Sequence, residues 1–292
     1  MISITNLCKS FGPKVVLANL NLQINDGQVL GLVGINGAGK STLLRILCGV
    51  YKADAGEILV DGKPSYENEQ IKKDFFFLPD EPFYDQNSTP ASILALYCSL
   101  YNVDKDKYYE YLEHFKINLK EKLNKFSKGM KRQTFISLAL AIHPKYLVLD
   151  EAFDGLDPLA RLMFKRELVD MISDYHSTVI ISSHSLRELE DICDSFALLN
   201  NNHIVSNGNL TEALDELHKY QIAFKEVITK DIFPNVYKTY SSDGRVVKII
   251  TSLTIDELNE KLKNLNPVFI DELPVDFEEM FEAVVEEGGY LK

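Results

Sequence analysis

The sequence predicts an α/β protein built on a parallel sheet, followed by a small α+β domain at its carboxyl end. Short apolar runs, such as residues 29–33 and 146–149, have the length and composition of strands that are buried on both faces. Segments with apolar residues at helical spacing follow these runs, as in parallel sheets. After about residue 215 the pattern changes to alternating segments separated by turn residues.

Length and composition set the domain count and the class of partner. The 292 residues, 46% of them hydrophobic, suit one large and one small domain. We expect a domain over residues 1–215, with a helical subdomain at about 85–145, and a second domain over 216–292. The formal net charge of −12 disfavours nucleic acid, whose binding depends on Lys and Arg. No apolar run approaches the roughly 18 residues of a membrane span, and no leader opens the sequence, so we expect a cytoplasmic chain.

The strongest motif is residues 34–41, Gly-Ile-Asn-Gly-Ala-Gly-Lys-Ser, which fits the pattern Gly-x4-Gly-Lys-Ser/Thr. An apolar strand precedes it and an amphipathic helical pattern follows it, so its amide groups and a helix N-terminus can face phosphate oxygens. An incidental glycine-rich turn is therefore a poor explanation. We predict that Lys40 reaches the β- and γ-phosphates and that the Ser41 hydroxyl binds Mg²⁺. The predicted nucleotide-binding residues of this segment are Asn36, Gly37, Ala38, Gly39, Lys40, Ser41 and Thr42.

Phe11 ends the first alternating segment of the chain. A single aromatic residue near a strand end is usually part of the core. A site that binds nucleotide phosphates also needs an apolar platform for the base, which makes Phe11 a candidate for stacking. Both interpretations stay open at this point.

Two adjacent carboxylates, Asp150 and Glu151, end the apolar run at residues 146–149. Ligands of open α/β sheets bind at the carboxyl ends of strands, and successive side chains of a strand diverge. Asp150 can hold Mg²⁺, while Glu151 faces the attacking water as general base or orienting group. His184 ends another apolar run and should lie on a neighbouring strand. A lone histidine there is usually structural, but this position favours a γ-phosphate contact.

A second helix N-terminus begins at Ser127, after a tyrosine-rich helical segment at about residues 90–126. Ser127 is a good N-cap, Gly129 lies beside it, and cations follow. An ordinary capped helix is the simpler interpretation of this segment taken alone.

Taken together, these motifs resemble the nucleotide-binding subunits of ATP-binding cassette (ABC) transporters over about residues 1–215. The resemblance implies a P-loop NTPase fold, with Walker A at residues 34–41 and Walker B at 147–151. It also implies roles for single residues: Phe11 in the A-loop, Glu151 as the catalytic glutamate, Asp157 in the D-loop and His184 as the switch histidine. Ser127, Lys128 and Gly129 hold the signature position and would contact ATP bound by a second, head-to-tail chain.

Two positions depart from the family pattern. The signature usually reads Leu-Ser-Gly-Gly-Gln, whereas residues 126–130 read Phe-Ser-Lys-Gly-Met. Asp80 stands at the position of the Q-loop glutamine, and we expect it to ligate Mg²⁺ or position water with a shorter reach. Both departures are similar to those of bacterial exporters whose permeases are separate chains of the ABC-2 type.

The resemblance therefore implies an ATP-hydrolysing subunit, with ATP and Mg²⁺ as cofactors, that powers export through a separate multi-spanning permease. Toxic peptides or drugs are candidate cargo. The chain would pair with an identical or related chain on the inner face of the cell membrane, and a groove around Asp80, Phe83 and Tyr84 would contact the permease. The alternative is a soluble ABC ATPase that moves no solute, such as an iron–sulfur assembly ATPase.

The carboxyl-terminal domain has strand patterns at residues 220–228, 236–240 and 246–250. A capping box at Thr254 begins a helix, and a last helix after Asp276 is expected to stop at Gly288 and Gly289. We expect this domain to stabilise the dimer or to regulate it.

Overall fold

The computed structural model describes residues 1–287 and divides the chain into two compact units, Met1–Asn207 and Gly208–Lys292. The expected boundary at residue 215 lies further on, at the end of helix α8 (Leu210–Asp215). The expected helix stop at Gly288 and Gly289 lies outside the described residues. Among residues 1–287, no helix has both the length and the apolar character that crossing a bilayer requires.

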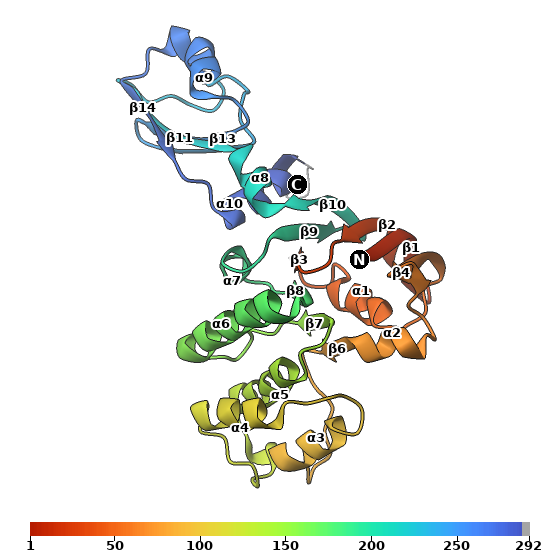
Figure 1. Cartoon of the computed structure of the whole chain (residues 1–292). Helices are drawn as coiled ribbons and strands as arrows, with labels where there is room; N and C mark the ends of the chain where they lie inside the picture. Colours follow the sequence, from red (N-terminus) through yellow and green to blue (C-terminus); the bar gives the residue numbers. More distant parts are fainter. Residues whose placement is uncertain (288–292) are drawn as a thin grey trace. The chain divides into compact units, whose positions relative to one another are not determined.

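A six-stranded sheet forms the centre of the first unit, and five of its strands run parallel (Figure 1). Every residue of β3, β7 and β8 is buried, because helices cover both faces of such a sheet. This confirms the predicted α/β class. In spatial order the strands are β10 (His203–Asn209), β9 (Ser195–Asn200), β3 (Val29–Val33), β8 (Thr178–Ser182), β7 (Tyr146–Asp150) and β6 (Phe75–Leu78).

A second sheet in this unit is antiparallel and supplies one wall of the candidate site. Its strands, in order, are β2 (Lys14–Ile24), β1 (Ile2–Phe11), β4 (Ala55–Val60) and β5 (Lys63–Pro64). Strands β1 and β2 form a hairpin in which Phe11 pairs with Lys14. Gly12 sits in the turn at φ +58°, a backbone conformation that glycine adopts without steric cost.

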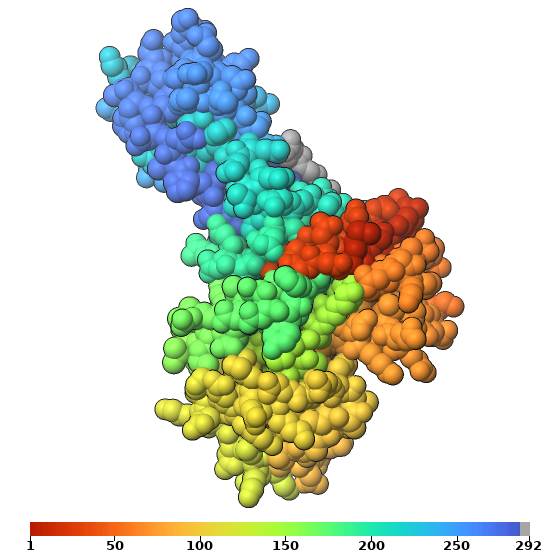
Figure 2. All heavy atoms as spheres, viewed as in Figure 1, coloured from red at the N-terminus to blue at the C-terminus, as the bar shows by residue number. Residues whose placement is uncertain are grey.

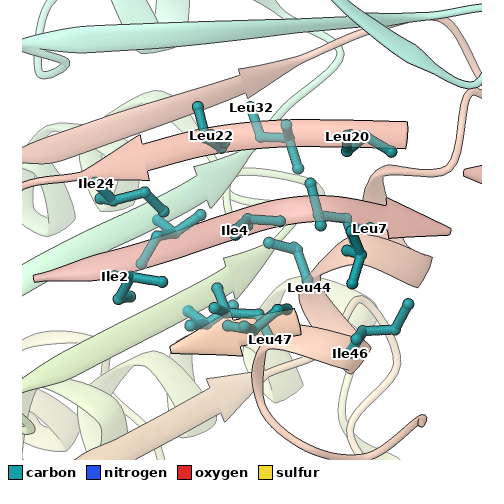
Figure 3. Packing of buried hydrophobic residues seen from close by; sticks show 14 of the residues in the cluster. Ile2, Ile4, Leu7, Leu20, Leu22, Ile24, Leu32, Leu44, Ile46 and Leu47 are labelled. Carbon is teal, nitrogen blue, oxygen red and sulfur yellow. The ribbon is translucent and has the colours of Figure 1, made fainter. Parts of the chain in front are cut away.

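Helix α1 (Lys40–Leu47) lies between the two sheets, where its apolar side chains meet those of β1 and β2 (Figure 3). Leu44 and Leu47 of α1 are each 1% exposed. Burying a leucine side chain contributes about 1.5–3 kcal/mol, so this packing fixes the helix and the loop that precedes it. The remaining helices of the unit are α2 (Glu69–Asp74), α3 (Pro90–Tyr97), α4 (Lys105–His114), η1 (Leu123–Lys125), α5 (Lys128–Ile142), α6 (Pro158–Tyr175) and α7 (Leu186–Glu190).

Helices α3, α4 and α5 gather beside the β6 edge of the sheet, and Figure 2 shows the atoms of this insert, in yellow, as one continuous body. Its tyrosines serve mainly as core side chains with a polar end. Tyr108 is fully buried and donates to the Pro90 carbonyl at 3.2 Å. Tyr111 donates to Glu167 of α6 at 2.8 Å and so ties the insert to the rest of the unit.

The second unit is an antiparallel sheet with helices, which confirms the predicted α+β class. Its strands, in order, are β12 (Thr239–Asp243), β13 (Val246–Thr251), β11 (His218–Ala223) and β14 (Phe269–Leu273). Its helices are α8, α9 (Ile255–Leu262), η2 (Lys263–Leu265) and α10 (Phe277–Glu287). Leu258 and Leu262 of α9 pack on Tyr220 and Ile222 of β11. The sequence did not indicate β14, an edge strand with two acidic residues and no clean alternation.

Candidate active site

The phosphate loop joins β3 to α1 and depends on glycine at two points. Gly37 and Gly39 have φ of +83° and +111°. A Cβ atom on Gly39 would lie 2.7 Å from a methyl of Leu17, and one on Gly34 would lie 2.3 Å from the Leu199 carbonyl oxygen. Glycine is therefore required at residue 34 for space, and at residue 39 for both space and backbone conformation.

Lys40 is buried at the floor of this loop, with 6% of its side chain exposed. Its ammonium group donates to the Gly34 carbonyl at 2.6 Å and lies 3.8 Å from the nearer Glu151 oxygen. Burial lowers the pKa of Lys40, while the charges of Glu151 and Asp150 act in the opposite direction. The loop thus holds a cation where phosphate oxygens would enter.

A cavity of about 430 Å³ opens over this loop and is large enough for a nucleotide. It brings together most of the predicted binding residues; Ala38 instead packs in the core. Lys14 and Val16 also line it, although we did not identify them from the sequence. Their position in the sequence could have identified them, because Lys14 pairs with Phe11 across the β1–β2 hairpin. The lining residues are Phe11, Lys14, Val16, Asn36, Gly37, Gly39, Lys40, Ser41, Thr42 and Glu151.

Phe11 is 45% exposed at the wall of this cavity, so the core interpretation does not hold for its ring. The edge of the ring meets Tyr51 at a centroid distance of 5.6 Å, and the Lys9 ammonium lies 5.3 Å from its centroid. Lys9 is itself paired with Asp54 at 2.8 Å. These neighbours brace an aromatic surface that is available for stacking a base.

We predict that Phe11→Ala raises the KM for ATP about tenfold and leaves kcat nearly unchanged, because stacking contributes about 1–3 kcal/mol per base. Steady-state turnover across ATP concentrations measures this. Tyr109→Ala, which removes a similarly exposed ring from the helical insert, serves as the matched control. An unchanged KM in Phe11→Ala would contradict the stacking role.

Asp150 is 1% exposed at the end of β7. Its Oδ1 accepts hydrogen bonds from Ser41 at 3.1 Å and from Ser182 at 2.8 Å, while its buried Oδ2 has no hydrogen-bond partner. A buried carboxylate oxygen without a donor fits a cation or a cation-bound water. Within residues 1–287 no cluster of three or more acidic, His or Cys side chains could hold a metal. Where Mg²⁺ binds with phosphate, it commonly takes one or two protein ligands and completes its shell with phosphate and water.

If Ser41 and Asp150 hold Mg²⁺, Asp150→Asn should raise the Mg²⁺ concentration required for tight ATP binding at least about tenfold. Titrating Mg²⁺ against the fluorescence of a bound nucleotide analogue measures this without relying on turnover. Asp170→Asn, a change on helix α6 that does not touch the cavity, is the control. An unchanged Mg²⁺ requirement would remove Asp150 from the metal site.

Glu151 follows Asp150 in the left-handed region, at φ +50°. Its amide donates to Ser182, and its Oε2 lies 3.1 Å from the His184 amide nitrogen and 2.9 Å from His184 Nδ1. Strands β7 and β8 are hydrogen-bonded neighbours, which brings the histidine to the glutamate. The glutamate side chain is 18% exposed and the histidine 59%. Glu151 therefore faces both Lys40 and the cavity, with His184 at its outer side.

The signature residues do not line the phosphate-loop cavity of their own chain. Ser127 is exposed at the N-terminus of α5, where its hydroxyl accepts from the Met130 amide at 3.1 Å. Lys128 is paired with Asp154 at 2.6 Å. Asp157 is exposed and caps α6 by accepting from the Ala160 amide at 2.9 Å.

Asp80 lines a separate cavity of about 350 Å³ and is held by Arg132. The Arg132 guanidinium, 2% exposed, donates to the Asp80 carboxylate at 2.8 Å and to the Asp80 carbonyl at 2.7 Å. Burial lowers the pKa of Arg132, and the Asp80 charge opposes this shift. The structure does not bring Asp80 into the cavity of Ser41 and Glu151, so its metal role stays a prediction. The sequence did not identify Arg132, which is one of several cations after Ser127.

A phosphate loop, a buried strand-end aspartate and a glutamate facing the loop lysine define a P-loop nucleotide-binding protein. The "ABC transporter" family model matches residues 17–154. The chain is 32% identical over 232 residues to the lantibiotic transport ATP-binding protein SrtF of Streptococcus pyogenes, covering 77% of this chain and 99% of SrtF. The chain therefore belongs to the ABC transporter ATP-binding proteins: it binds ATP and hydrolyses it to power transport.

Three further proteins are similar to this chain. The ABC transporter ATP-binding protein YtrB of Bacillus subtilis (strain 168) is 29% identical over 284 residues, 97% of each chain. A solved ATP-binding subunit of an ABC transporter is 26% identical, with a TM-score of 0.67 over 74% of this chain and 92% of that one. A bacterial Atm1-family ABC exporter with ATP bound has a TM-score of 0.65 at 22% identity, over 73% of this chain and 39% of that one, and shows the fold alone.

Proposed function

We propose that this chain powers the export of a substrate through a separate, multi-spanning permease of the ABC-2 type. The observation that carries the proposal is the match to SrtF over 99% of its length, because its name assigns it to lantibiotic transport. Toxic peptides are accordingly the first candidate cargo, with drugs as a second. None of the similar proteins described above supports the alternative of an iron–sulfur assembly ATPase.

In the proposed reaction the loop amides and Lys40 bind the β- and γ-phosphates, and Phe11 stacks on the base. Ser41 and Asp150 would hold Mg²⁺, which supplies charge neutralisation on the phosphate oxygens. Glu151 orients the attacking water and accepts its proton, and His184 is placed by its contact with Glu151 to reach the γ-phosphate. Together these groups account for in-line phosphoryl transfer to water.

Two nucleotide-binding chains, identical or related, are proposed to close head to tail on ATP and to reopen after hydrolysis. Ser127, Lys128 and Gly129 lie at the N-terminus of α5, a 15-residue helix, and do not line their own chain's cavity. Such a helix end favours an anion, so these residues suit the γ-phosphate of ATP held by the opposite chain. Asp157 would lie in the same interface.

The permease is proposed to dock at the groove lined by Asp80, Glu81, Pro82, Tyr84, Lys128, Lys131 and Arg132. Phe83, within this segment, is 86% exposed and offers an apolar anchor. Docking there would keep the chain peripheral on the inner face of the cell membrane. The second unit is proposed to stabilise the dimer or to regulate it, and the match to YtrB extends over nearly the whole chain, including this unit.

Purifying the tagged chain from gently solubilised membranes tests the proposal. We expect recovery with a multi-spanning membrane protein that is lost in Phe83→Ser. Val169→Ser, which changes a half-exposed apolar side chain on α6, should retain the partner. Recovery in the cytosol with soluble partners would contradict export while leaving the ATP chemistry intact.

A further inference from the structure

The side chain of Lys128 lies across the turn that follows Glu151. Its ammonium group is 2.6 Å from Asp154 Oδ2. Its aliphatic carbons lie over Gly155, where an added Cβ atom would be 3.4 Å from Lys128 Cγ. The backbone packs equally closely, since a Cβ atom on Gly129 would lie 2.5 Å from the Gly155 carbonyl oxygen. The N-terminus of α5 is therefore in direct contact with this turn.

The turn itself begins at Glu151. The Asp154 amide donates to the Glu151 carbonyl at 3.1 Å, so the position of Asp154 is linked to the backbone of Glu151. Glu151 has φ of +50°, a backbone conformation that is unfavourable for a non-glycine residue and persists only where surrounding contacts hold it. On its strand side, Ser182 supplies such a contact. On the opposite side, Lys128 pairs with Asp154, whose amide donates to the Glu151 carbonyl.

The charges of Lys128 and Asp154 support their contact, and a second ion pair connects Lys128 to the groove that Asp80 lines. The hydrogen bond with Asp154 raises the pKa of Lys128, and that with Lys128 lowers the pKa of Asp154, so both groups are charged at neutral pH. Lys128 also lies 3.8 Å from the Asp80 carboxylate, which the buried Arg132 fixes. A continuous set of charges thus runs from the groove to the turn that carries Glu151.

We propose that Lys128 is a positioning residue for ATP hydrolysis, which acts through Asp154 to hold the turn that places Glu151. This rests on the role of Glu151 given under the proposed function. The positioning role uses only the side chain of Lys128. The amide groups at the α5 N-terminus can therefore still bind the phosphate held by the opposite chain. The pair is specific to a chain with lysine at this signature position and aspartate at residue 154.

Two single variants and their combination test the proposal. Asp154→Asn and Lys128→Met should each lower kcat about threefold to fivefold, because each removes the ion pair that holds the turn, with KM for ATP within about twofold. The double variant should be no slower than the slower single variant, because both remove the same contact. Lys128→Arg, which can still pair with Asp154, should lose less kcat than Lys128→Met.

Lys145→Met is the matched control, because it breaks a pair of similar length, 2.7 Å to Asp61, before the opposite end of β7. Its kcat should equal that of the wild type. Full kcat in Asp154→Asn, additive losses in the double variant, or a loss of kcat in Lys128→Arg as large as that in Lys128→Met would overturn the proposal. If Glu151→Gln keeps near-normal turnover, the role of Glu151 given under the proposed function fails. An inactive Glu151→Gln beside a normal Asp154→Asn refutes only the role of Lys128.

Discussion

Replacing Lys40 by alanine is expected to abolish ATP binding at physiological concentrations. The ammonium group is buried beneath the loop, where it donates to the Gly34 carbonyl, and we propose that the β- and γ-phosphates bind at this loop. Removing one partner of a buried charged contact costs about 2–5 kcal/mol, which raises Kd by about 30-fold to several thousandfold. Isothermal titration of ATP into the purified variant measures this directly.

Lys52→Ala provides the comparison, since this lysine does not line the cavity. It should bind ATP like the wild type, and both variants should show the circular dichroism of the folded chain. Tight ATP binding by a folded Lys40→Ala variant would mean that the loop is not the phosphate site.

Glu151→Gln is expected to bind ATP within about twofold of the wild type while its turnover falls about 10²–10⁴-fold. Glutamine retains the size of glutamate and an oxygen that can accept from the His184 amide, so the local geometry should persist. It cannot accept a proton from water, and general-base catalysis typically contributes this factor. Phosphate release at saturating ATP and Mg²⁺ is the measurement.

Glu57→Gln, on an exposed position of β4, is the control and should hydrolyse ATP at the wild-type rate. Near-normal turnover by Glu151→Gln would remove Glu151 from the base role. The neighbouring Asp150 would then be the remaining strand-end carboxylate in the site.

The sequence was sufficient where a local pattern fixes local geometry. The glycines and lysine of residues 34–41 set the loop, and the apolar runs before Asp150 and His184 identify strands buried on both faces. Parallel strands end at the same edge of a sheet, so the meeting of Glu151 and His184 could be expected before any coordinates. The N-cap role of Ser127 followed in the same way from residue type and position.

The site residues that the sequence did not identify are placed by tertiary contacts. Lys14 and Val16 enter the cavity only because β1 and β2 form a hairpin with a particular register. Arg132 is an ordinary helix residue by pattern, and its importance arises from burial against the loop after β6. Asp80 was predicted as a metal ligand from its place at the Q-loop position of the family pattern, and its ion pair with Arg132 could not be read from that pattern.

The most direct test of the account is the mass of Glu151→Gln in solution, by light scattering during gel filtration, with and without ATP and Mg²⁺. Slow hydrolysis should trap the closed state if two chains share ATP between the phosphate loop of one and Ser127 of the other. We expect twice the mass of one chain with ATP, and a return to one chain when Lys40→Ala is added. A variant that binds ATP yet keeps the mass of a single chain would contradict the account.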